Sequence, residues 1–256
     1  VRRADVSIVG NCAEALEALL PLVDETQDIS EWRAELDAWR VDMPLEYNDG
    51  AQDGTLHAEW VIREIARLTD RNVVVTTDVG QHQMFTAQYY LFDKPRRWIN
   101  SGGLGTMGFG LPAAIGAKLA RPQDTVITVT GDGSFMMNVQ ELATIKRFRL
   151  PVKIVVIDNQ RLGMVKQWQQ LFFNERYSET DLSDNPDFVS LAAAFAIPGH
   201  SISRKDEVAD ALDAMFTWPG PYLLHVRIDE TDNVWPLVPP GAANHDMMTD
   251  LPQWEE

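Results

Sequence analysis

Two runs of strand-forming residues separated by one helical segment constrain the fold of this chain most. The runs are TVITVT at 125–130 and VKIVVIDN at 152–159, and NVQELATIKRF between them has helical spacing. Strands that are β-branched or apolar at consecutive positions, rather than at alternate ones, are typical of sheets covered on both faces. We therefore predict an α/β fold, a parallel sheet with helices on both faces.

The same alternation of helix and strand extends along most of the chain. Further helices are expected at 56–68, 108–120, 187–196 and 205–216, and further strands at 72–80 and 222–229. Upstream, a strand at 4–11, an amphipathic helix at 12–23 and a helix bearing two tryptophans precede a turn-rich linker. We predict that residues 1–50 are the end of a preceding α/β domain with a linker, 51–230 the sheet domain and 231–256 a C-terminal tail.

Composition excludes several classes of protein. The 256 residues carry a formal net charge of −16, so nucleic acid is not an expected partner. The single cysteine, Cys12, fits a reducing compartment, and we expect a cytoplasmic protein. No apolar run reaches the ~18 residues of a membrane span, so no membrane association is expected. Because the chain opens within a strand-like segment, we expect it to be a piece of a longer protein.

Three polar turns follow three of the predicted strands, at the edge where parallel sheets bind ligands. They are TDVGQHQ, TGDGS and DNQRLG. In the second turn, Gly131 and Gly133 let the backbone approach a ligand, and the following helix offers N–H groups suited to a phosphate. Asp132 stands between them and would repel a phosphate unless a cation lay between the two.

Magnesium resolves this conflict because it prefers oxygen ligands from carboxylates, amides, phosphates and water. Asn159 offers an amide oxygen at the end of the next strand. The 26 residues between Asp132 and Asn159 suit one β–α–β crossover, so both side chains are expected at the same sheet edge. Either turn alone would more often be a simple capping turn, but the pair at this spacing predicts a magnesium–phosphate site.

This GDG-to-Asn spacing resembles the thiamine diphosphate motif. The segments SGGLGTMGFGLPAAIGA, GDGSFMMNVQEL, LGMVKQWQQLF and NVWPLVPPGAAN resemble the large catalytic chain of acetohydroxyacid (acetolactate) synthases, most like the bacterial isozymes, and the resemblance covers nearly all of 54–245. The implied fold is the thiamine diphosphate-binding fold. Residues 1–50 resemble the end of the family's central, FAD-associated domain, and a pyrimidine-binding domain is expected upstream.

The resemblance implies thiamine diphosphate and Mg²⁺ as cofactors, with FAD in the complete protein. The implied reaction is decarboxylation of pyruvate and condensation with a second pyruvate or 2-oxobutyrate, in branched-chain amino-acid biosynthesis. A homodimer or higher oligomer with its active site between subunits is expected, with a regulatory small subunit as a further partner. The activating glutamate lies in the pyrimidine domain, so no catalytic residue is assigned here and the chain alone is expected to be inactive.

The resemblance also implies a magnesium site with named ligands. Asp132 and Asn159 correspond to the side-chain ligands, and the backbone carbonyl of Arg161 is the third. Asp158 stands where an Asn is common, which leaves the ligand itself intact.

Further residues are implied around the cofactor and the substrates. Met107 would hold the cofactor in its bent form, and Met164 and Trp168 would line the substrate and herbicide pocket. The full set of implied cofactor contacts is Gly80, Gln81, His82, Gly105, Met107, Gly131, Asp132, Gly133, Ser134, Asn159, Gly163 and Met164.

Three alternatives stay open. Another thiamine diphosphate-dependent decarboxylase or carboligase would carry the same motif. Residues 103–108 match GxGxxG, with Asp124 about where a ribose-binding acid would lie, so an NAD-binding Rossmann enzyme is a rival, although the preceding RRWIN makes a poor central strand. A noncatalytic module that retains a cofactor fold is the third, and the intact GDG and Asn159 argue against it.

Overall fold

The computed structural model describes residues 3–23, 27–45, 47, 50 and 54–251. The chain divides into two compact units, Val1–Glu46 and Tyr47–Glu256. The second unit contains the sheet and all of the predicted site residues.

The first unit consists of helices. They are α1 (Cys12–Leu19), a 3₁₀ turn η1 (Leu20–Leu22) and α2 (Ser30–Asp42). The Asn11 side chain accepts a 2.9 Å hydrogen bond from the Ala13 N–H and so begins α1. The strand expected at 4–11 is wrong: the described part of this unit has no second strand to pair with it, and an extended segment becomes a strand only through such a ladder.

The second unit is built on a six-stranded sheet in the order β2-β1-β3-β4-β6-β5, with every pair parallel. The strands are β1 (Val74–Thr77), β2 (Trp98–Asn100), β3 (Val126–Gly131), β4 (Val152–Asp158), β5 (Gly199–Ile202) and β6 (Tyr222–Arg227). The central strands β3 and β4 are buried along their whole length. Gly131 pairs with Ile157, so the next positions, Asp132 and Asp158, lie side by side at the carboxyl edge.

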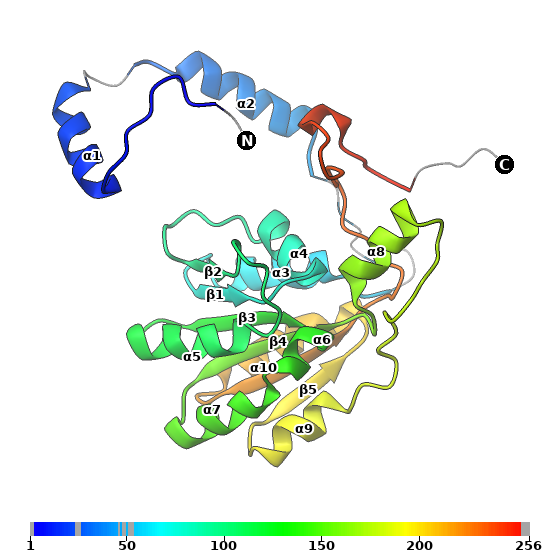
Figure 1. Cartoon of the computed structure of the whole chain (residues 1–256). Coiled ribbons are helices and arrows are strands. Elements are labelled where there is room, and N and C mark those ends of the chain that lie inside the picture. Colours follow the sequence, from blue (N-terminus) through cyan, green and yellow to red (C-terminus); the bar gives the residue numbers. More distant parts are fainter. Residues whose placement is uncertain (1–2, 24–26, 46, 48–49, 51–53, 252–256) are drawn as a thin grey trace. The chain divides into compact units, whose positions relative to one another are not determined.

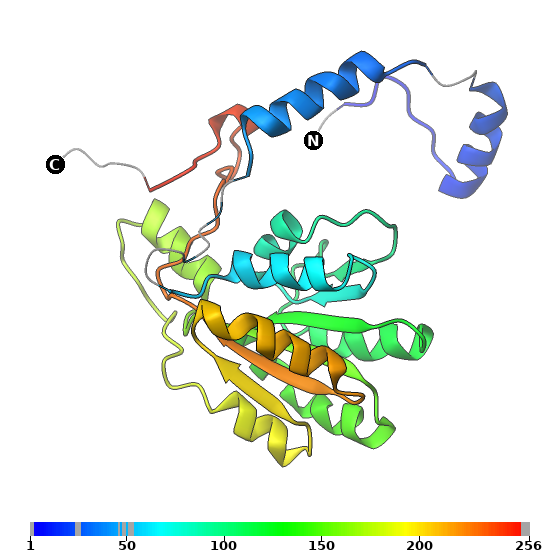
Figure 2. The same ribbon diagram turned by 180° about the vertical axis from the view of Figure 1, so that it is seen from behind.

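Helices cover both faces of the sheet, which confirms the predicted α/β architecture. Figure 1 shows α5 (Gly110–Ala120), α6 (Asp132–Met137), α7 (Leu142–Phe148) and α9 (Phe188–Ala194) in front of the sheet. Figure 2, the view from behind, shows α3 (Ala58–Leu68) and α10 (Val208–Thr217) on the opposite face, and α4 (Gln81–Tyr89) packs into the same apolar core as these two. Alternate strand residues face the two cores: Val75 and Val155 point to one, and Val74 and Ile154 to the other.

The remaining elements are short or lie at the sheet edges. The 3₁₀ turns are η2 (Val139–Glu141), η3 (Lys205–Glu207) and η4 (Asn244–Asp246), and α8 (Gly163–Phe172) follows the turn after β4. The sequence predicted neither β2 nor β5, because both are short edge strands without a buried apolar run. Within the described ranges, none of the helices is long and apolar enough to cross a membrane.

Candidate functional site

A cavity lies where β1, β3 and β4 end, and all three predicted turns contribute to its wall. Two of the predicted residues, Gly105 and Trp168, lie outside this lining. The predicted residues that do line it are Gly80, Gln81, His82, Met107, Gly131, Asp132, Gly133, Ser134, Asn159, Arg161, Gly163 and Met164. The sheet therefore brings together residues separated by more than eighty positions in the sequence.

Asp132, which lines the cavity, forms a carboxyl pair with the neighbouring Asp158. Asp132 is 3% exposed and accepts a 3.0 Å hydrogen bond from Asn185 Nδ2. Burial raises the pKa of Asp132 well above its ordinary range, and the neighbouring charge of Asp158 raises it further. A bound cation would reverse this effect, because it compensates the buried negative charge.

The pKa of Asp158 is shifted in the opposite direction to that of Asp132. Burial works to raise the pKa of Asp158, but hydrogen bonds from His225 and from the Gln160 N–H outweigh it and lower the pKa. His225 Nε2 lies 2.9 Å from Asp158 Oδ2, and its Nδ1 lies 2.8 Å from Ser201 Oγ. Asp158 is thus an ionised, hydrogen-bonded support beside the carboxyl of Asp132.

A chain of amides fixes Asn159. Its Nδ2 donates to Gln81 Oε1 at 3.0 Å, and Gln81 Nε2 donates in turn to Gln167 Oε1 at 3.0 Å and to the Asp232 carbonyl at 3.1 Å. Asn159 Oδ1 accepts one hydrogen bond, from the Arg161 N–H at 3.1 Å. An amide oxygen has two lone pairs, so Oδ1 keeps one for a cation. The oxygen and the nitrogen of the Gln81 amide both take part in these hydrogen bonds. The expected contact of Gln81 with a diphosphate stays a prediction.

His82 is the clearest sign of a missing ligand. It is 6% exposed, and its Nε2 is buried without a hydrogen-bond partner among the described residues. Burial lowers the pKa of His82 to about 3, so the ring is neutral. The ring lies so close to Gly131 that a Cβ there would stand 2.7 Å from His82 Nδ1. A buried ring nitrogen without a partner calls for a ligand or an ordered water.

Two glycines keep the cavity open and its polar groups in place. A Cβ at Gly163 would lie 2.0 Å from Gln81 Oε1 and 2.5 Å from Asn159 Nδ2, so a side chain here would break the amide chain. A Cβ at Gly133 would meet the Leu162 side chain at 2.9 Å. Gly163 therefore requires glycine because of close approach rather than backbone conformation, whereas at Gly133 only the ends of flexible side chains would have to shift.

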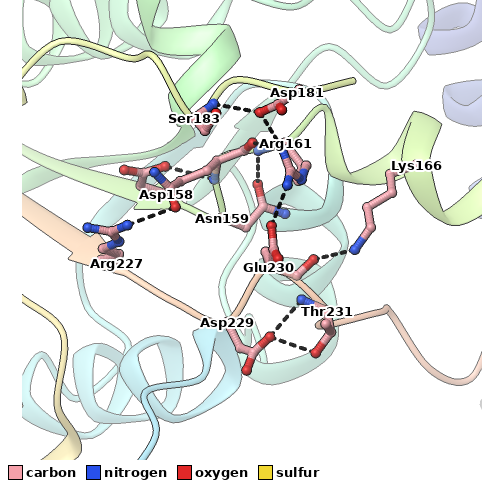
Figure 3. Close-up of polar contacts among 11 residues, drawn as sticks. Asp158, Asn159, Arg161, Lys166, Asp181, Ser183, Arg227, Asp229, Glu230 and Thr231 are labelled. Carbon is pink, nitrogen blue, oxygen red and sulfur yellow. Dashed lines mark hydrogen bonds and ion pairs between the residues drawn. The ribbon is translucent and has the colours of Figure 1, made fainter. Parts of the chain in front are cut away.

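The loop after β4 is held by ion pairs. Figure 3 shows the Arg161 guanidinium between Asp181 and Glu230, and its Nη2 lies 2.6 Å from Glu230 Oε2. Lys166 Nζ donates to the Glu230 carbonyl at 2.6 Å. These contacts tie the loop that carries Asn159 to segments after α8 and β6. Coordination by the Arg161 backbone carbonyl stays a prediction.

Asp78 anchors the loop that carries Met107. It is fully buried, its Oδ1 accepts a 2.7 Å hydrogen bond from the Gly110 N–H, and Thr130 Oγ1 donates to its Oδ2. Asp78 stands in the first predicted turn, but sequence reasoning gave it no role. Sequence reasoning also gave no role to His225, Gln167 or Asn185. Only His225, a polar residue within an apolar strand, left a signal in the sequence.

Met164 and Trp168 share a second hollow. Met164 lines the cavity and also an adjoining open groove of about 970 Å³ that contains Trp168 and Phe173. Trp168 is 39% exposed and meets Phe172 edge-on at 5.8 Å between ring centroids. Met164 and Val165 thus lie between the cavity and an apolar groove on α8.

The donor set of the cavity fits magnesium and a diphosphate. The two candidate metal ligands are a carboxylate and an amide oxygen, which are the hard donors that Mg²⁺ prefers. The unpartnered Nε2 of His82 and the glycine-lined wall leave room and hydrogen-bonding capacity for an anion.

Comparison with known proteins agrees with this geometry. Over residues 78–226 the chain matches the family described as thiamine pyrophosphate enzyme, C-terminal TPP binding domain. Over 98% of its length it is 54% identical to the acetolactate synthase isozyme 2 large subunit of Escherichia coli, of which it covers 45%. It is 41% identical to the acetolactate synthase large subunit of Haemophilus influenzae, over 98% of the chain and 44% of that protein. It is also 41% identical to the chloroplastic acetolactate synthase 2 of Brassica napus, over 95% of the chain and 39% of that protein. The chain spans less than half the length of these relatives.

Proposed function

The chain belongs to the thiamine pyrophosphate enzymes as a C-terminal cofactor-binding domain, and we propose that the complete protein is an acetolactate synthase large subunit. It would decarboxylate pyruvate and join the product to a second pyruvate or to 2-oxobutyrate, giving 2-acetolactate or 2-aceto-2-hydroxybutyrate for branched-chain amino-acid biosynthesis. The observation that carries this proposal is the cavity of Asp132, Asn159 and His82 in a chain 54% identical to such an enzyme.

Each residue of the cavity has a part in binding. Asp132 and Asn159 would hold Mg²⁺, with the Arg161 carbonyl, between the sheet edge and the diphosphate. Gly133 and Ser134, in the first turn of α6, would face the diphosphate oxygens. When bound, thiamine diphosphate supplies the carbon nucleophile and the electron sink for loss of carbon dioxide.

His82 would act as a neutral donor. A neutral imidazole protonated on Nε2 can donate to an anionic oxygen in the cavity, and its low pKa prevents it from gaining a second proton at neutral pH. It would therefore bind and orient rather than transfer protons.

The apolar residues would shape the space around the reacting atoms. Met107, on the loop anchored by Asp78, would pack against the cofactor and favour its bent form. Met164 would exclude water from the cavity, and Trp168 would border the second keto acid in the groove.

Several further features of the proposal rest on the family resemblance alone. We expect FAD in the complete protein, residues 1–50 at the end of an FAD-associated domain, and an activating glutamate from a partner's pyrimidine domain. We also expect a homo-oligomer in the cytoplasm. The words "large subunit" in the names of the bacterial relatives support a smaller regulatory partner.

The test is product analysis with the complete protein, pyruvate, thiamine diphosphate, Mg²⁺ and FAD. We expect acetolactate as the main product, and none from the 256-residue chain alone, because the family resemblance places the activating glutamate in the pyrimidine-binding domain. Acetaldehyde as the main product would favour the alternative, another 2-keto acid decarboxylase. Steady acetolactate formation by the chain alone would contradict the division of the active site between domains.

A further inference from the structure

A second group of metal-ligating side chains lies outside the lining of the cofactor cavity. His57 immediately precedes α3, Glu59 lies in its first turn, and Asp232 lies in the segment after β6. One potential ligand atom from each of the three lies within 4.8 Å of the other two. An imidazole and two carboxylates from distant parts of the sequence thus converge on one point.

Two of the three residues are buried, Asp232 is partly exposed, and the group is incompletely satisfied. His57 is 6% exposed and Glu59 9% exposed. His57 Nδ1 lies 2.9 Å from Asp232 Oδ2, but within the described part of the chain neither His57 Nε2 nor Glu59 Oε2 has a hydrogen-bond partner. Buried polar atoms without partners are rare and costly, and Glu59 Oε2 is one of them in this group. His57 faces Asp232 with Nδ1, so Nδ1 rather than Nε2 is its potential ligand atom here.

An ordinary ion pair does not explain this arrangement. A hydrogen bond between His57 Nδ1 and Asp232 is complete without Glu59, and it leaves the buried Glu59 Oε2 without a partner in the described part of the chain. A cation between the three side chains would give that oxygen a partner as well.

We propose that His57, Glu59 and Asp232 bind a divalent cation of the zinc or manganese type. Imidazole combined with carboxylates suits these metals, whereas Mg²⁺ takes oxygen ligands almost exclusively. The site is separate from the magnesium site and does not depend on the proposed function. The cation would join the start of α3 to the segment after β6.

The site is connected to the cofactor cavity by one hydrogen bond. The backbone carbonyl of Asp232 accepts from Gln81 Nε2 at 3.1 Å, and Gln81 Oε1 accepts from Asn159. By fixing the segment of Asp232, the cation would fix the amide chain that orients Asn159. Its role is therefore structural support at a distance from the reacting atoms.

The test is zinc content and thermal unfolding of the complete protein. The protein is stripped with a chelator, dialysed against limiting Zn²⁺ in excess Mg²⁺, and analysed by mass spectrometry for bound zinc. The parent should hold one more zinc per chain than either His57→Gln or Glu59→Gln. Zn²⁺ should raise the unfolding temperature of the parent by several degrees and leave that of the two variants unchanged.

Glu64→Gln is the matched control, because Glu64 lies on the same helix and pairs with Arg67 at the surface. It should bind zinc like the parent. Glu59→Gln keeps the shape of the side chain and removes an unpartnered carboxylate, so its stripped form should fold at least as well as the parent. Equal zinc content in the parent and both variants, or no zinc in the parent, would overturn the proposal, whatever products the enzyme forms.

Discussion

Buried polar groups have hydrogen-bond partners at one end of the sheet and lack them, or lie beside a like charge, at the other. At the amino end, Lys153 Nζ donates to the Trp218 and Gly220 carbonyls at 2.6 and 2.9 Å, and Lys118 is held in the same manner by two carbonyls. At the carboxyl end, Asp132 lies beside a second carboxyl and His82 Nε2 has no partner in the described chain. Burial of a charged group therefore does not mark a functional site by itself. Unused hydrogen-bonding or charge-balancing capacity beside a cavity, as at His82 and Asp132, is the better indicator.

The largest expected effect is at the carboxyl end. Asp132→Ala and Asn159→Ala in the complete protein should each weaken Mg²⁺-dependent binding of thiamine diphosphate by more than about 100-fold. Loss of a residue that only hydrogen-bonds to a metal ligand already lowers metal affinity roughly ten- to a hundredfold, and these two residues are proposed as ligands themselves. The measurement is a magnesium titration at fixed cofactor. Unchanged titrations in both variants would end the metal assignment.

His82→Phe separates binding from stability. The change keeps an aromatic ring but removes the unpartnered nitrogen, so cofactor affinity should fall roughly ten- to a hundredfold, the value of a hydrogen bond to a charged group. The unfolding free energy of the cofactor-free protein should stay the same or rise. Calorimetric binding and chemical denaturation of the same preparation measure both. A loss of stability with unchanged affinity would place His82 among the structural residues.

Lys153→Met should behave in the reverse way at the amino end. It leaves two carbonyls without a donor, so the unfolding free energy should fall by about 1.5 kcal/mol at neutral pH while cofactor affinity stays unchanged. Denaturant unfolding and the same titration give both values. A large loss of cofactor affinity in this variant would remove the contrast between the two ends.

The pH dependence of stability, compared between the parent and Lys153→Met, gives a further test of the contrast. Burial lowers the pKa of Lys153 from 10.5 to about 8. The folded protein therefore binds this proton less tightly than the unfolded chain does, so its stability falls as the pH drops from 10.5 toward 8 and then levels off. The stability of the parent relative to Lys153→Met should thus increase from pH 8 to 10.5, and a constant difference would contradict the pKa shift.

The smallest expected effect is in the groove next to the cavity. Trp168→Leu should leave pyruvate condensation largely intact and lower the preference for 2-oxobutyrate roughly five- to tenfold, because contact with one methylene group is worth ~1 kcal/mol. It should also lower sensitivity to herbicides that bind this groove. Competition between the two keto acids, with both products quantified, tests this. An unchanged product ratio would mean that Trp168 does not select the acceptor.

Much of the site could be predicted because the sheet dictates it. Once the β-branched runs indicate parallel strands, Asp132 and Asn159 must emerge at the same edge. Asn185, by contrast, comes from a loop whose path no periodic pattern fixes, and His57 reaches Asp232 only through tertiary packing. The strand expected at 4–11 failed because a strand depends on a partner that its own sequence does not reveal.

The central claim is that the unused polar capacity at the carboxyl edge serves magnesium and a diphosphate. Calorimetric titration of the complete protein with thiamine diphosphate, in Mg²⁺ and again in a chelator, tests this most directly, with NAD as the comparison ligand. The account predicts saturable binding of thiamine diphosphate that requires Mg²⁺, and no binding of NAD. Equal binding in the chelator, or binding of NAD in place of thiamine diphosphate, would contradict it.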